Sequence, residues 1–80
     1  MVRKTLNEYK WRPDTDFSKI VVYYVDRIDP RGYRTMSGDE IEDMGDKFIF
    51  RKDGGMIPYH RVIKIEYAGK VVWKKVHQDE

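Results

Sequence analysis

The sequence predicts a small α+β domain with a curved, mainly antiparallel sheet of about five strands and two short helices. Runs of β-branched and aromatic residues alternate with short turn signals, which is typical of antiparallel strands. Two capping-box patterns stand before short apolar stretches and mark the two expected helix starts. The length of 80 residues predicts a single domain, residues 1–80, because a chain of this size supports only one core.

Both helices are expected to be short. Thr5 and Glu8 have the capping-box spacing, and the helix that they start must end before Pro13, since the residue preceding a proline disfavours helix. Ser37 and Glu40 form the second box, and the helix after them is expected to stop at Gly45 in a left-handed conformation.

The clearest expected strand covers residues 17–27. Its centre, residues 20–25, is β-branched and aromatic without a polar break, so we expect both of its faces to be substantially covered. Turn signals at residues 29–32 and 53–55 separate the other expected strands, which are residues 33–36, 47–51 and 56–67.

The last hairpin turns at Gly69. A two-residue loop of Ala68 and Gly69 would need a positive φ at Ala68, which is costly for a residue with a Cβ. We therefore expect a three-residue loop, residues 67–69, in which Glu66 opposes Lys70. That register predicts an apolar face made of Ile63, Ile65, Val71 and Trp73. It places His60 on the opposite, solvent-facing side and Arg61 at the rim of the apolar face.

Composition restricts the possible functions. The net charge of +2 is not the strong basic excess of a protein that binds duplex DNA without sequence preference. The chain has no cysteine and no Cys/His cluster with zinc spacing, so we expect no metal and no cofactor. No apolar run approaches the ~20 residues that span a bilayer, and the first residues lack a signal peptide. We expect a cytoplasmic protein without membrane contact and with a frayed tail at residues 76–80; the oligomeric state is left open.

His60 and Arg61 are the strongest candidates for a binding site. An arginine fork binds two phosphate oxygens, and the neighbouring imidazole supplies another donor. In the structural alternative Arg61 pairs with a carboxylate such as Asp26, and His60 is merely exposed. Arg27 adds a second fork if its strand pairs with that of His60, although it could equally form a weak surface ion pair.

Trp11 and Tyr59 are candidates for stacking on unpaired bases, although a small domain without disulfides also needs aromatic side chains in its core. Catalysis has little support, because His60 and His77 are the two histidines and no nucleophile–histidine set is apparent. A small phosphodiesterase with His60 as general acid or base is the less favoured alternative.

One stretch has a specific resemblance, the pattern Asp53-Gly54…Ile57-Pro58-Tyr59-His60-Arg61-Val62…Ile65…Gly69…Val71-Val72-Trp73. With Leu6…Trp11 and Tyr24-Val25-Asp26-Arg27, it resembles a small archaeal-type family of unknown function, also described as an RNA cyclic-group-end recognition domain. The resemblance implies a compact α+β domain that occurs fused to RNA-processing enzymes and binds RNA ends with a 2′,3′-cyclic phosphate. By position, it implies that His60 and Arg61 contact the phosphate, supported by Arg27 and Trp11.

Together, the residues and the resemblance predict a non-catalytic module that binds an RNA end or single-stranded element in RNA processing or repair. The candidate RNA-binding residues are His60, Arg61, Arg27, Trp11 and Tyr59, with no catalytic residue and no metal ligand. The alternative is an adaptor that docks onto an RNA-processing enzyme through an exposed hairpin or sheet edge.

Overall fold

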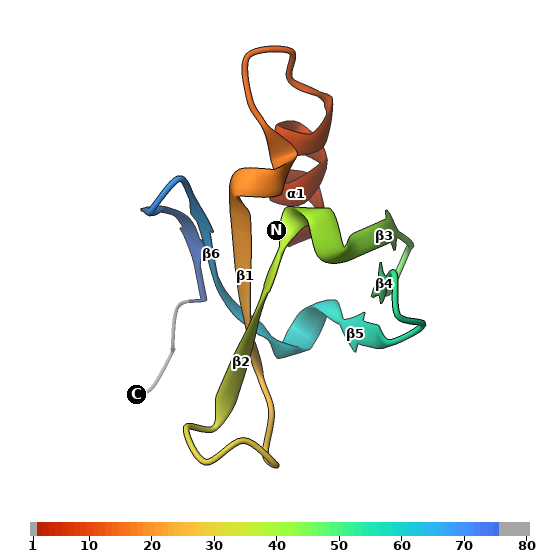
Figure 1. Cartoon of the computed structure of the whole chain (residues 1–80), viewed down its shortest axis with the longest axis vertical. Helices are drawn as coiled ribbons and strands as arrows, with labels where there is room; N and C mark the ends of the chain where they lie inside the picture. The colour runs from red at the N-terminus through yellow and green to blue at the C-terminus, as the bar shows by residue number, and fades with distance from the viewer. Residues whose placement is uncertain (1, 76–80) are drawn as a thin grey trace.

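The computed structural model describes residues 2–75, which form one α-helix and two antiparallel sheets that face each other across the core (Figure 1). The four-stranded sheet has the order β2-β1-β6-β7, with β1 (Ile20–Val25), β2 (Tyr33–Ser37), β6 (Val62–Tyr67) and β7 (Lys70–Lys74). The three-stranded sheet has the order β3-β4-β5, with β3 (Ile41–Met44), β4 (Phe48–Arg51) and β5 (Met56–Pro58). The α+β class is confirmed, whereas the single sheet of about five strands is wrong. The predicted frayed tail, residues 76–80, lies outside the described residues.

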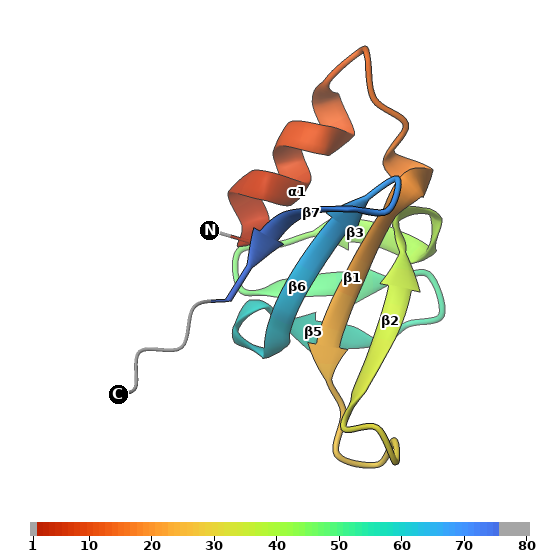
Figure 2. The same ribbon diagram turned by 90° about the vertical axis from the view of Figure 1, so that its left-hand side faces the viewer.

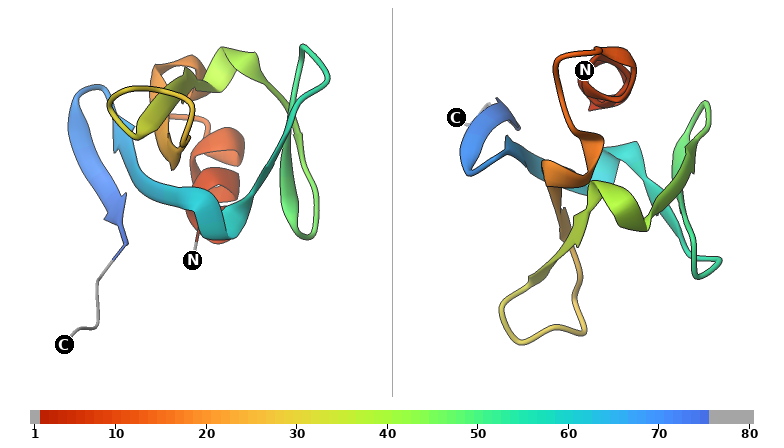
Figure 3. Two further views of the ribbon diagram at one scale, coloured as in Figure 1. Left: turned by 90° about the horizontal axis from the view of Figure 1, so that it is seen from below. Right: turned by 45° about the horizontal axis from the view of Figure 1, so that its top comes forward.

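The helix α1 (Val2–Trp11) begins before Thr5, the start that the capping pattern predicted. The reason is burial, since Val2 and Leu6 are one helical turn apart and both lie in the core. In Figure 3 (right), α1 lies between the two sheets at one side of the core. The earlier start therefore adds an apolar residue to the helix face that packs on the sheets.

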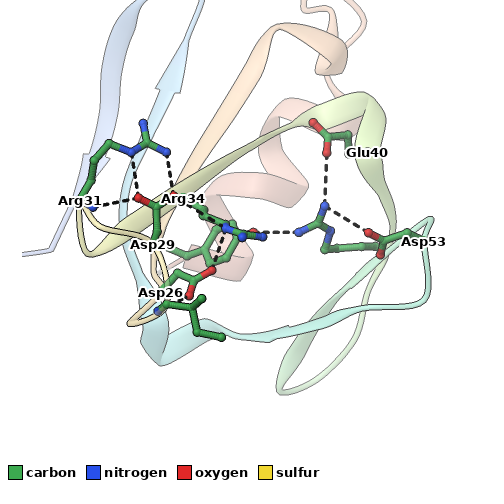
Figure 4. A network of polar contacts seen from close by, with 9 residues as sticks. Asp26, Asp29, Arg31, Arg34, Glu40 and Asp53 are labelled. Carbon is green, nitrogen blue, oxygen red and sulfur yellow. Dashed lines mark hydrogen bonds and ion pairs between the residues drawn. The ribbon is translucent and has the colours of Figure 1, made fainter.

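The core fills the space between the sheets. Its buried side chains are Val2, Leu6, Ile20, Val22, Tyr24, Met36, Ile41, Met44, Ile49, Val62 and Ile65. Arg51 on β4 connects the sheets, because its Nη1 donates a hydrogen bond of 2.8 Å to the Tyr24 hydroxyl on β1. Its Nη2 lies 3.2 Å from Asp53 and 3.5 Å from Glu40, and this cluster is drawn in Figure 4.

The strand β1 is shorter than the expected residues 17–27, because a 3₁₀ turn, η1 (Phe17–Lys19), precedes it. Its burial alternates: the side chains that face the core are buried, whereas Val21 and Tyr23 on the other face are half-buried. The expectation that both faces are substantially covered therefore holds for only one of them. The outer face of the four-stranded sheet is left partly open.

The predicted second helix is wrong. The capping box exists, and Glu40 accepts a hydrogen bond of 3.1 Å from the Ser37 backbone N–H, but the turn is a 3₁₀ helix, η2 (Gly38–Glu40). The chain then extends into β3, where a bulge between Ile41 and Asp43 directs both Ile41 and Met44 inward. Because of the bulge, two inward-facing apolar residues are three positions apart, which is also the spacing on one face of a helix, and this explains the wrong prediction.

The predicted strand over residues 56–67 is interrupted. Its first part is β5 in one sheet and its second part is β6 in the other, joined by the 3₁₀ turn η3 (Tyr59–Arg61). Pro58 ends β5, and its fixed φ of −63° and missing N–H favour a turn here. The chain thus changes sheets at His60 and Arg61 (Figure 1).

The last hairpin has a two-residue loop, so the predicted three-residue loop is wrong. Tyr67 opposes Lys70, and Ala68 and Gly69 have φ values of 51° and 85°. Positive φ at both loop residues matches the turn whose twist suits a hairpin, and this outweighs the cost at Ala68.

The predicted faces of the hairpin are also wrong in part. A register shift in β6 sets Ile63 apart from the regular pairing with β1 and turns Val62 inward, where it is 1% exposed. Ile65, not Ile63, opposes Trp73. His60 and Arg61 lie in η3 rather than on a strand, and both are exposed.

Among residues 2–75, no helix has both the length and the apolar character that crossing a membrane requires.

Replacing Ala68 by asparagine should stabilise the protein. Asparagine tolerates the φ of 51° better than alanine does, so we expect the free energy of unfolding to rise by about 0.5–1 kcal/mol. Urea unfolding of Ala68→Asn beside the wild type measures this change in the free energy of unfolding. Ala68→Val should lower the free energy of unfolding, because a β-branched residue is strained at positive φ. Equal stability of the three proteins would contradict the two-residue loop.

Replacing Gly38 by alanine should destabilise the protein. A Cβ at Gly38 would lie 1.8 Å from the Phe17 carbonyl oxygen, so η1 and η2 would have to move apart. We expect a loss of at least about 2 kcal/mol in urea unfolding. Gly32→Ala is the control, because a Cβ there meets nothing within 4 Å and only its φ of 84° opposes it, at about 1 kcal/mol. A smaller loss for Gly38→Ala than for Gly32→Ala would contradict the close approach.

Candidate functional site

A surface hollow of about 530 Å³ brings three of the predicted site residues together. Arg27, His60 and Arg61 line it, with Val25, Asp26 and Ile28. Their neighbourhood follows from the antiparallel pairing of β1 with β6, in which Tyr24 opposes Val62. The residues that follow Tyr24 therefore lie beside those that precede Val62, as the sequence predicted for the case in which the two strands pair.

Two anchored residues hold His60 and Arg61 in place. Before them, the Tyr59 hydroxyl donates a hydrogen bond of 2.7 Å to the Gly45 carbonyl oxygen. After them, Val62 is buried in the core. Between these two anchors the short turn η3 leaves both side chains exposed at the hollow. A rigid backbone and free polar side chains are what a preorganised binding site requires.

The carboxylate proposed as a structural partner of Arg61 pairs with another residue. Asp26 lies 2.9 Å from Nε of Arg34, on the neighbouring strand β2 (Figure 4). It also accepts a hydrogen bond of 2.9 Å from the Ile28 backbone N–H. Within residues 2–75, neither Arg27 nor Arg61 forms an ion pair. The two guanidinium groups at the hollow are therefore available to a bound anion.

The negative charge of a second carboxylate near the hollow, Asp29, is also balanced by arginine side chains. Hydrogen bonds from the Arg31 side chain and backbone lower the pKa of Asp29 to about 2, and the charge of Arg34 adds to the effect. The two side-chain bonds from Arg31 measure 3.1 Å each (Figure 4). Asp29 therefore stays ionised and paired at neutral pH, which limits its repulsion of an anion nearby.

Tyr59 and Trp11 do not line the hollow. The Tyr59 ring packs against the core, and burial raises the pKa of its phenol. Trp11 is 74% exposed, but it is the last residue of α1, which ends at the opposite end of the molecule from the β1–β2 loop (Figure 2). The structure thus separates these two stacking candidates from the three polar ones.

Sequence reasoning missed the apolar part of the hollow. Val25 and Ile28 belong to its lining, and Ile28 is 87% exposed. The signal in the sequence was an isoleucine between two charged residues, Arg27 and Asp29, at a turn where no core position is expected. An apolar surface beside cationic donors suits a ligand that has both a ring and a charge.

The hollow has the chemistry of an anion site. Two guanidinium groups offer paired N–H donors, and the imidazole adds one or two more according to its protonation. Among residues 2–75, no group of histidine and carboxylate side chains is arranged to hold a metal ion.

Comparison with known proteins gives one consistent result. Residues 1–75 match the family described as the MJ1316 RNA cyclic group end recognition domain. A UPF0248 protein of Archaeoglobus fulgidus is 41% identical, over 88% of this chain and 99% of its own length. A UPF0248 protein of Methanopyrus kandleri is 40% identical, over 79% of this chain and 84% of its own length. No solved structure gives a significant match. The resemblance noted in the sequence is confirmed, and the chain belongs to the MJ1316 RNA cyclic group end recognition domain family.

Proposed function

We propose that this protein is a non-catalytic RNA-end-binding module whose hollow holds a terminal 2′,3′-cyclic phosphate. The observation on which the proposal rests is that Arg27, His60 and Arg61 line one hollow while neither arginine has an internal carboxylate partner among residues 2–75. The hollow, at about 530 Å³, lies within the usual range of small-ligand sites, roughly 300–1,000 Å³. The description of the family agrees with this chemistry.

The cyclic end fits the donor set. A 2′,3′-cyclic phosphate has one negative charge and two free oxygens, so an arginine fork and one further donor satisfy it. A 3′-phosphate has a higher charge and keeps more of its hydration, which makes it costlier to bring against Val25 and Ile28. Discrimination between the two ends would therefore arise from the apolar lining as well as from the cationic groups.

A binding role is favoured over a catalytic one. Opening a cyclic phosphate with water requires a general base and a general acid, both within hydrogen-bond reach of the reacting atoms. His60 offers one such group, while the Asp26 carboxylate at the hollow is engaged by Arg34 at 2.9 Å. We propose that the module presents ends left by RNA cleavage to a processing or repair enzyme in the cytoplasm.

Binding of three dinucleotides tests the proposal. They share one sequence and end in a 2′,3′-cyclic phosphate, a 3′-phosphate or a 3′-hydroxyl, and calorimetry or fluorescence gives each Kd. We expect the cyclic end to bind most tightly, and Arg61→Ala to weaken it by at least about tenfold, the value of a hydrogen bond to a charged group. Arg12→Ala is the matched control, because Arg12 is also exposed and its ion pair within residues 2–75 is with Asp14, away from the hollow.

Two outcomes would overturn the proposal. Equal affinity for all three ends, or no binding of any, would favour the alternative of a protein-interaction adaptor. Turnover of the cyclic end that is lost in His60→Ala would favour a phosphodiesterase. Thermal unfolding of each variant shows whether it remains folded.

Salt dependence gives a second test on the same ligand. Each phosphate contact to a single strand contributes a slope of about −0.7 in the plot of log affinity against log salt. A dinucleotide with a cyclic end has two phosphates, so we expect a shallow slope, no steeper than about −1.4, and a still shallower one in Arg61→Ala. A slope that Arg61→Ala leaves unchanged would contradict an arginine–phosphate contact.

A further inference from the structure

A second hollow lies on the outer face of the four-stranded sheet. It has a volume of about 380 Å³, and we call its polar lining the tyrosine–lysine face, made of Tyr23, Tyr33, Lys64, Lys74 and Lys75. Figure 2 looks onto this side of the sheet, where β7 crosses in front of the upper ends of β6 and β1, and the lower parts of β1, β2 and β6 have no described helix or strand in front of them. The proposed site for the RNA end does not include any of these residues.

Strand register places aromatic rings beside cationic side chains here. Tyr23 on β1 opposes Lys64 on β6, which in turn opposes Lys74 on β7. The Lys64 ammonium lies 4.2 Å from the centre of the Tyr23 ring. Tyr33 on β2 lies beside Tyr23, with ring centres 5.9 Å apart. Two neighbouring rings and a row of lysines are the parts of a surface that binds single-stranded nucleic acid.

The opposed pair of lysines on β6 and β7 destabilises the sheet by charge repulsion. Like charges that face each other directly across two strands repel, and Lys64 and Lys74 occupy such a pair. Glu66, 3.3 Å from Lys64, compensates one of them. Lys74 forms no ion pair within residues 2–75. An anion bound over this pair would remove the repulsion.

The tyrosine–lysine face adjoins the first hollow. Nζ of Lys75 donates a hydrogen bond of 3.0 Å to the backbone carbonyl oxygen of His60, which lines that hollow. Tyr23 also stands on the same strand as Val25, two residues away, and Val25 lines the first hollow. A polymer that ends in the first hollow therefore has a continuous surface along which to extend.

We propose that the nucleotides preceding the bound end run across the tyrosine–lysine face as unpaired RNA. Their bases stack on Tyr23 and Tyr33, and their phosphates face the lysines. The occupant is single-stranded because paired bases would not offer their faces to the two rings. This inference rests on the proposed function, since it takes the first hollow as the position of the RNA end.

Chain length is the variable that tests the inference. A dinucleotide and an octanucleotide, both ending in a 2′,3′-cyclic phosphate, are titrated against the same protein. We expect the octanucleotide to bind at least about tenfold more tightly, because one base–aromatic stack contributes roughly 5- to 150-fold. Adding a complementary strand that covers all but the end should abolish the gain.

Two variants test whether the tighter binding of the octanucleotide comes from the tyrosine–lysine face. Lys74→Ala removes an exposed lysine, and Tyr33→Leu removes a ring but keeps apolar bulk. Both should weaken the octanucleotide by about five- to tenfold and leave the dinucleotide unchanged, and Lys74→Ala should lower the salt slope for the octanucleotide by about 0.7. Lys52→Ala, in the turn of the other sheet, is the matched control and should change neither. If the Tyr33→Leu variant is unfolded, the binding of the octanucleotide to Lys74→Ala, a change at an exposed position, decides the test alone.

The outcomes separate this inference from the proposed function. An octanucleotide that binds no more tightly than the dinucleotide, or whose advantage is not reduced in Lys74→Ala, overturns the inference and leaves end recognition intact. Octanucleotides that bind equally with a cyclic or a hydroxyl end, and lose affinity in Lys74→Ala, overturn end recognition and support the face as an RNA surface. Equal loss in Lys52→Ala would mean that only net charge matters and would overturn the inference.

Discussion

The antiparallel pairing of β1 with β6 is the constraint on which the structure depends. It forms the centre of the four-stranded sheet and places Ile20, Val22 and Ile65 in the core, where each side chain contributes about 1.5–3 kcal/mol by burial. The same register sets Tyr24 opposite Val62 and so brings the β1–β2 loop beside η3. Packing and candidate chemistry therefore depend on one strand pair, and a slip by one residue would disturb both.

The change of sheet at η3 explains why polar side chains gather there. A chain that passes between two sheets must leave the ladder of each, so its side chains at that point are not required to fill the core. Here the backbone is still fixed, by the hydrogen bond from Tyr59 to Gly45 on one side and by buried Val62 on the other. A corner of this kind combines precise position with freedom of sequence, which favours a binding function.

The sequence predicted the features that depend on neighbours along the chain. Turn chemistry located the loop at residues 53–55, and the run of β-branched residues located β1. The pair His60 and Arg61 could be proposed from the sequence because its chemistry does not depend on long-range contacts, and the structure places both residues at one hollow. The errors arose where distant packing decided the outcome: β3 was mistaken for a helix because its bulge depends on β4, and the break after Pro58 depends on there being two sheets.

The surface ion pairs near the first hollow affect its local charge more than they affect the stability of the protein. The pairs of Arg34 with Asp26 and of Arg31 with Asp29 involve half-exposed guanidinium groups, and such pairs add little to the free energy of unfolding. They nevertheless neutralise the carboxylates around the first hollow, while Arg61 keeps its charge unpaired among the described residues. A net charge of only +2 is thus compatible with a local cationic site, because pairing determines where the unbalanced charge lies.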